Sequence, residues 1–280
     1  MTIDFHTHNF PDSLAARALE HMISKLESSV LPVGDGTLGN QLRDLGKYGI
    51  DKAVMCPVAT KPSQADIILK TAVEIRDGAM GEEAARKIIP FASVHPKDED
   101  FKARLEAVAK AGIKGVKVHP YYQEIDFSDK SVVPFFETVR DLGLVVVSHC
   151  GFDLGYTGAP MCCGPFEIAT LFKNVPGLAP RFVAAHLGGF SGNPDRATDA
   201  ILDSGCYIDS AIILPDIEKP EGARICAEWP AERILFATDY PWCDQKTVMD
   251  WVKKNRPDES DREKIFGGNA IRLLGLEEKQ

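Results

Sequence analysis

The sequence predicts an α/β fold, and within that class a closed (β/α)8 TIM barrel. Short apolar runs alternate with helical patterns along all 280 residues. Several of these runs, such as LVVVSH at 144–149, are rich in β-branched residues, which suits strands buried on both faces of a parallel sheet. The length is ordinary for one barrel, so we expect residues 1–280 to form a single domain. No Gly-rich dinucleotide motif follows a strand, which argues against a doubly wound open sheet.

Eight short apolar segments are the expected strands of this barrel, and turn signals or helical patterns separate them. They are Thr2–His6, Lys52–Pro57, Ile88–Val94, Gly115–His119, Leu144–His149, Phe182–His186, Cys206–Asp209 and Ile234–Thr238.

Helices are predicted from the spacing of apolar residues between the strands. Asp100–Ala111 places apolar residues three to four positions apart on one face, and Gly112 follows as a stop signal. Val132–Leu142 repeats the pattern and is also followed by glycine. A further helix is expected at Leu14–Ser28, inside the long segment Asn9–Asn40 after the first strand, which we expect to form a lid over the barrel.

Composition and charge exclude several classes of protein. The chain is 44% hydrophobic and 26% charged, as is typical of soluble proteins. Its net charge of -9 argues against a nucleic-acid surface. No apolar run approaches the roughly 20 residues of a membrane span, and no signal-peptide pattern is present. The seven cysteines lack C-x-x-C spacing, so we expect a reducing, cytoplasmic compartment and interpret the adjacent Cys162 and Cys163 as small buried hydrophobes.

Six of the seven histidines fall at the C-terminal ends of predicted strands. His6 and His8 end the first strand on one face, and the others that end strands are His95, His119, His149 and His186; Asp209 and Asp239 end the last two strands, and His21 lies on a predicted helix. In a parallel barrel these ends meet on one face, where such enzymes keep their catalytic residues. For His95 and His119, each followed by proline, a strand ending at a turn is an equally simple explanation.

Four motifs in this order, IDFHTH, VVSHCG, AAHLGG and FATDYP, resemble the amidohydrolase superfamily. The most similar branch is the amidohydrolase-related group that includes aminocarboxymuconate semialdehyde decarboxylase, whose closing helix resembles IFGGNAIRLLGL here. The resemblance extends from Thr2 to Leu276. It implies a distorted (β/α)8 barrel that binds one divalent metal, most often zinc.

Matched by motif, the resemblance also implies a role for each site residue. His6, His8, His149 and Asp239 would bind the metal, Asp239 would also handle a proton, and His186 would act as acid or base beside the metal. Three imidazoles and a carboxylate suit zinc and leave one position for water. Bound zinc lowers the pKa of that water to about 7.

The fourth strand departs from this pattern, because KGVKVHP places Lys117 and His119 on one face. Binuclear amidohydrolases carry a strand-four lysine, which CO₂ converts into a bridge between two metals, and His186 would then bind the second metal. The mononuclear branch has no such bridge and its motif set matches better, so we expect one metal. A free Lys117 would instead attract an anionic substrate group, or pair with an acidic neighbour inside the barrel.

Two chemistries fit such a site. Metal-activated water could hydrolyse a small ester, lactone or amide, or the metal could support nonoxidative decarboxylation of a small aromatic or unsaturated carboxylate. Arginines are few near the predicted active face, which favours hydrolysis, and the complete ligand set argues against a non-catalytic metal-binding barrel. We expect a small-molecule substrate, contacted by Lys117, His119, His95, Phe152 and Trp242, and no nucleic-acid or membrane partner. A homodimer is compatible with the sequence.

Overall fold

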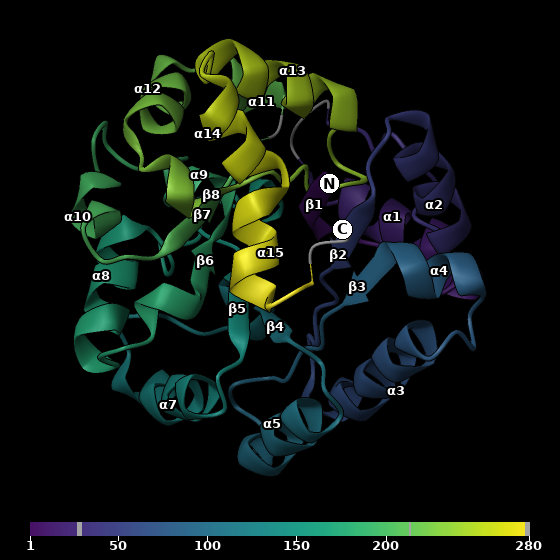
Figure 1. Ribbon diagram of the computed structural model, residues 1–280. Helices are drawn as coiled ribbons and strands as arrows, with labels where there is room; N and C mark the ends of the chain where they lie inside the picture. The colour runs from purple at the N-terminus through teal and green to yellow at the C-terminus, as the bar shows by residue number, and fades with distance from the viewer. Residues whose placement is uncertain (27–29, 213, 278–280) are drawn as a thin grey trace.

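The computed structural model describes residues 1–26, 30–212 and 214–277, and it confirms the predicted TIM barrel (Figure 1). Within these described ranges, eight parallel strands run in sequence order around the barrel. They are β1 (Ile3–Thr7), β2 (Lys52–Met55), β3 (Ile88–Pro90), β4 (Gly115–Val118), β5 (Val145–Ser148), β6 (Phe182–Ala184), β7 (Tyr207–Asp209) and β8 (Ile234–Leu235). Each lies at a predicted position, but most end earlier than predicted because the chain bends out of the ladder to form the loops above the barrel.

The strands form two hydrogen-bonded sheets, β1–β3 and β4–β8, which backbone contacts close into a ring. Between β3 and β4, Ala92 bridges to Val116, and the Lys117 amide donates to the Ala92 carbonyl at 2.9 Å. At the other seam, the Phe5 amide of β1 donates to the carbonyl of Phe236, just after β8, at 2.8 Å. The barrel is therefore closed, and its eight strand ends converge on one face.

Helical segments surround the ring, and most of them cover its outside (Figure 1). They are α1 (Asp12–Ile23), α2 (Leu38–Lys47), α3 (Ala65–Arg76), α4 (Glu82–Lys87), α5 (Phe101–Lys110), α6 (Pro120–Gln123), α7 (Val133–Asp141), α8 (Pro165–Asn174), α9 (Ala185–Gly189), α10 (Asp199–Leu202), α11 (Leu214–Ile217), α12 (Pro220–Glu228), α13 (Gln245–Asn255), α14 (Glu259–Glu263) and α15 (Asn269–Leu274). None of them, within the residues that the structure describes, is long and apolar enough for a bilayer crossing.

The predicted helices are confirmed with small shifts at their ends. α5 and α7 lie inside the predicted segments, and the stop signal Gly112 has a left-handed φ of 75°. α1 begins at Asp12, directly after Pro11, and contains His21 as predicted, but it ends at Ile23. The expected end of that helix, Ser28, lies outside the described residues.

The core has two layers, one between strands and helices and one inside the barrel. Inside, Phe5 and Phe91 pack edge to face with ring centroids 6.1 Å apart. The last helix, α15, lies across one end of the ring in Figure 1, and its Leu273 and Leu274 pack into the interior layer. Its buried Asn269 donates to the carbonyls that flank the start of β8, at 2.7 and 2.6 Å. The N-terminal end of the barrel is thus plugged, and functional side chains gather at the C-terminal end.

Candidate active site

The first functional group combines His6 of β1, His8 directly after it, and Asp239. β8 ends at Leu235, so the prediction that Asp239 ends this strand is wrong: it lies four residues beyond, in the loop above the barrel. Successive side chains along a strand alternate between its two faces. The Thr7 hydroxyl donates to a β2 carbonyl on one face, and His6 and His8 lie on the opposite face. Asp239 Oδ1 lies 3.4 Å from His6 Nε2 and 3.0 Å from His8 Nε2. The two imidazole planes cross at 68°, so their lone pairs can point at a common position.

These separations have the scale of a metal site. A zinc–ligand bond of about 2.0–2.1 Å places neighbouring ligands of a tetrahedral site about 3.3 Å apart. The three donor atoms of His6, His8 and Asp239 all lie within 4.8 Å of one another. The donor set therefore fits a divalent cation without rearrangement of the backbone.

Electrostatics keep this group in the form that binds a cation. Burial, followed by the nearby Lys117, lowers the pKa of His6 well below its ordinary value, so the imidazole is neutral. Although burial opposes ionisation, the hydrogen bond from His8 helps to hold the pKa of Asp239 below its usual range. Metal ligands must be deprotonated, and both shifts favour that state.

Both residues predicted to act on protons sit in strained backbone. His186 (φ 57°) and Asp239 (φ 57°) belong to the few non-glycine residues of the described chain with positive φ. β6 ends at Ala184, so the prediction that His186 ends the strand is wrong: His186 begins a left-handed run that continues through Leu187 and Gly188. Such conformations cost about 1–3 kcal/mol each and concentrate at functional sites.

The turn re-aims His186 toward the other histidines. Its ring centroid lies 5.4 Å from that of His6 and 4.7 Å from that of His149. His186 Nδ1 lies 2.8 Å from the carbonyl oxygen of Ala211, and a carbonyl can only accept. Nδ1 therefore carries a proton that it donates to this carbonyl, and Nε2 is the ring nitrogen that remains for chemistry.

A second group joins His119, which follows β4, with His149, which follows β5, and Asp153. His119 Nε2 lies 3.3 Å and His149 Nε2 3.9 Å from Asp153 Oδ2. The two rings are stacked, 4.2 Å apart and only 14° from parallel, and Tyr122 stacks on the far face of His119 at 3.9 Å. In-plane lone pairs of parallel rings do not meet. This group therefore cannot hold one cation in its present arrangement, although its donor atoms lie within 4.8 Å of one another.

His149 thus stands between the two groups. Burial, followed by His119, lowers its pKa well below the ordinary value. Its Nε2 is buried without a hydrogen-bond partner, as expected of a nitrogen that binds a cation. The structure brings His6, His8 and Asp239 together, and the inclusion of His149 as their fourth ligand stays a prediction.

Lys117 projects from β4 into the same site. Its side chain is buried, and Nζ lies 2.6 Å from His6 Nε2. The partner that hydrogen-bonds it is an imidazole, so the hypothesis of an ion pair with an acidic neighbour inside the barrel is not what the structure describes. The lysine lies where it can touch either a metal ligand or a substrate.

The amidohydrolase family matches residues 3–276 of this sequence. The chain belongs to the amidohydrolase family. Proteins of this family bind a divalent metal, and the donor group of His6, His8 and Asp239 supplies a place for one. No curated protein matches the chain.

Solved structures share the barrel at low sequence identity. The 5-carboxyvanillate decarboxylase from Sphingomonas paucimobilis is 14% identical, with a TM-score of 0.72 over 99% of each chain. The dihydroxybenzoic acid decarboxylase from Polaromonas sp. JS666, with bound manganese and the inhibitor 2-nitroresorcinol, is 18% identical, with a TM-score of 0.66 over 99% of this chain and 98% of that one. An Acinetobacter baumannii protein named as a probable 2-pyrone-4,6-dicarboxylic acid hydrolase, with citric acid bound, is 15% identical, with a TM-score of 0.67 over 98% of this chain and 99% of that one. At these identities the likeness shows the fold.

Three other side chains were predicted to contact substrate in this amidohydrolase-family barrel. β3 ends at Pro90, so His95 does not end that strand, and its Nδ1 accepts from the Lys97 amide at 3.1 Å as part of a turn. Phe152 and Trp242 are half-buried beside the site: their amides donate to the carbonyls of Ser191 and Asp239, respectively. Their contact with substrate remains a prediction.

The adjacent cysteines behave as packing residues. Cys163 is fully buried, Cys162 is partly buried against the core, and both are free thiols. Burial raises the pKa of Cys163 well above its ordinary value, which makes it a poor nucleophile.

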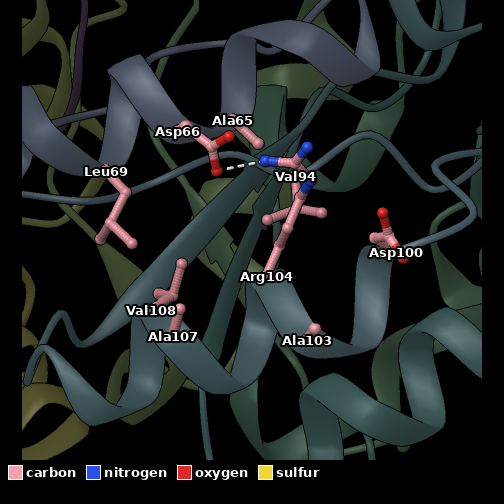
Figure 2. Close-up of a pocket in the computed structure, with 9 residues that line it drawn as sticks. All are labelled: Ala65, Asp66, Leu69, Val94, Asp100, Ala103, Arg104, Ala107 and Val108. Atoms are coloured by element: carbon pink, nitrogen blue, oxygen red, sulfur yellow. Dashed lines mark hydrogen bonds and ion pairs between the residues drawn. The ribbon is translucent and has the colours of Figure 1, made fainter.

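A hollow of about 330 Å³ between α3 and α5 lies outside this site (Figure 2). Its charged residue Arg104 pairs with Asp66 and, at 2.7 Å, with Asp98. Apart from Asp66, Asp100 and Arg104 its lining is aliphatic, so the lining residues offer no nucleophile and no group of metal ligands.

Sequence reasoning did not find Asp153 and assigned no role to Asp209. Asp153 lies in the loop after β5, four residues beyond His149, with no motif around it. Asp209 was recognised as the end of β7, and its position there was the signal. The structure shows Asp209 Oδ2 3.0 Å from His6 Nδ1.

Proposed function

We propose that this chain is a metal-dependent hydrolase that uses activated water on a small ester, lactone or amide, with zinc as its metal. The observation that carries the proposal is the donor group of His6, His8 and Asp239 beside the imidazole of His186, whose Nδ1 is bound to a carbonyl. A divalent cation held there, with His149 as fourth ligand, would supply Lewis-acid activation of water and of the substrate carbonyl.

The chain's own residues provide the proton transfers. Asp239 is ionised and directs Oδ1 at both β1 histidines, so its carboxylate is placed to orient the attacking water and to take its proton. His186 carries a proton on Nδ1, bound to a carbonyl, so Nε2 is the nitrogen placed to exchange a proton with the leaving group. General acid–base catalysis of this kind contributes about 10²–10⁴-fold to rate.

The positively charged side chains available to the site support hydrolysis over decarboxylation. The guanidinium of Arg196 is 61% exposed and paired with Asp199 at 2.8 Å and Glu228 at 3.7 Å, so it is not free to hold a departing carboxylate. Arg17 is exposed on α1. Lys117 is the cation that the site itself contains.

Decarboxylation is the second candidate because two of the structural relatives are named decarboxylases. In that reaction Lys117 would hold the substrate carboxylate, and His186 would deliver a proton to carbon. The two functions use the same metal residues and differ in the product, so one assay can separate them.

The test uses protein stripped of metal and reloaded with Zn²⁺ or, separately, Mn²⁺. Lactones, esters, amides and aromatic carboxylates are presented in parallel. Acid release from lactones and esters is followed in a pH-stat, amine release from amides with an amine-reactive dye, and CO₂ release from ¹³C-carboxyl substrates. We expect metal-dependent acid release that His186→Asn removes while metal stays bound. CO₂ release without net hydrolysis would replace the proposal by the second candidate. Metal binding with neither product would indicate a non-catalytic barrel.

A further inference from the structure

The end of β7 and the turn after it contact both His6 and His186. Asp209, the last residue of β7, is fully buried. Its Oδ2 lies 3.0 Å from His6 Nδ1, and its Oδ1 accepts from the amides of His186 at 2.9 Å and Ala211 at 3.1 Å. The Ala211 carbonyl in turn accepts from His186 Nδ1 at 2.8 Å. Both oxygens of one carboxylate are therefore committed, one to each half of the site.

The contacts around His6 define which of its nitrogens carries the proton. Lys117 Nζ lies 2.6 Å from His6 Nε2, and an ammonium group can only donate. Two donors cannot face each other at that distance, so Nε2 holds a lone pair and Nδ1 holds the proton, which it donates to Asp209. Asp239 Oδ1 lies 3.4 Å from the same nitrogen.

We propose that Asp209 is a positioning residue that fixes the tautomer of His6, so that Nε2 is always the nitrogen presented to the metal. With the Ala211 carbonyl, the same turn fixes His186 with Nε2 free. Carboxylates that hold ligand histidines in this way typically account for 10–100-fold in metal affinity or activity. The inference rests on the proposed metal site and deepens it by assigning the residue that orients its most buried ligand.

Asp209→Asn separates orientation from simple structural support. The amide oxygen can occupy the Oδ1 position and still accept from the two backbone amides, which fixes the amide's orientation. Its NH₂ group then faces His6 Nδ1 and donates to it, which forces the His6 proton onto Nε2. We expect a 10–100-fold loss of Zn²⁺ affinity, measured by competition with a chromophoric chelator, with the circular dichroism spectrum retained.

Nitrogen NMR of the metal-free protein with ¹⁵N-labelled histidine reads the tautomer directly. We expect His6 to be the Nδ1–H form in the wild type and the Nε2–H form in Asp209→Asn, with His6→Gln identifying the signal. Wild-type His6 in the Nε2–H form would overturn the inference, even if the variant failed to fold. A folded Asp209→Asn protein with unchanged Zn²⁺ affinity would overturn it as well.

Asp98→Asn is the matched control. Asp98 is also buried, with Oδ1 accepting from the Asp100 amide at 2.9 Å and Oδ2 paired with Arg104 Nε at 2.7 Å, but it lies outside the site. Its substitution should leave Zn²⁺ affinity unchanged; a loss equal to that of Asp209→Asn would show a general effect of burying an amide and would overturn the inference. Failure of wild type to bind any divalent metal would instead refute the proposed function, while the tautomer assignment would still be measured.

Discussion

The substitution His186→Asn should remove catalysis while preserving the metal. Asparagine tolerates left-handed backbone better than most residues, so the φ of 57° at this position costs the variant little. What disappears is the ring nitrogen Nε2, the free proton carrier of the site. We expect turnover to fall by about 10²–10⁴, which corresponds to about 3–5 kcal/mol of transition-state stabilisation, with about one metal retained per chain.

The assay pairs steady-state kinetics with elemental analysis of the same preparation. Arg196→Asn is the control, because Arg196 also has positive φ (64°) but lies on the surface, and its activity should match wild type. The reasoning fails if wild type binds two metals tightly and both His186→Asn and Lys117→Ala reduce that number. In that case His186 is a ligand and a carboxylated Lys117 bridges the metals.

Three further outcomes follow from the geometry. His6→Ala should lower metal content and activity together, because it removes a buried ligand; full metal occupancy by elemental analysis would contradict the assignment. Asp153→Asn should leave the metal content unchanged, because the stacked rings of the second group do not converge on a cation; loss of a metal ion would show that they rearrange to bind one. Asn269→Ala should destabilise the fold by about 1–3 kcal/mol in urea unfolding without altering metal affinity, because the carbonyls of Ala231 and Ile234, at the closed end of the barrel, lose their hydrogen-bond donor.

The barrel could be predicted from the sequence because its strands are buried on both faces and therefore appear in the sequence as continuous apolar runs. The histidines at strand ends were visible for the same reason, since a polar residue that ends an apolar run is conspicuous. The run FVAAH did not reveal where β6 stops, because Ala185 is as apolar inside a turn as in a strand. The left-handed run that aims His186 depends on hydrogen bonds to β7, which no local pattern encodes.

His95 illustrates the same error at another strand. It follows an apolar run and precedes proline, as His119 does, yet β3 ends five residues before it and its ring serves a turn. His119 instead follows β4 directly and stacks on His149. The two share a sequence context and differ in their distance from the ladder, which is set by pairing with neighbouring strands rather than by the residues themselves.

The donor group straddles the seam at which the barrel closes, so its geometry depends on the global fold. His6 and His8 belong to the start of the chain and Asp239 lies four residues after its last strand, and the Asp239 amide donates to the His6 carbonyl at 2.9 Å. Beneath them the buried carboxylate of Asp4 accepts from the Thr238 amide at 3.0 Å and the Thr238 hydroxyl at 2.6 Å. These bonds compensate the left-handed backbone at Asp239, which would otherwise relax. Metal affinity should therefore depend on closure of this seam: a barrel that opens between β8 and β1 separates the ligands, whereas one that loosens elsewhere leaves them together.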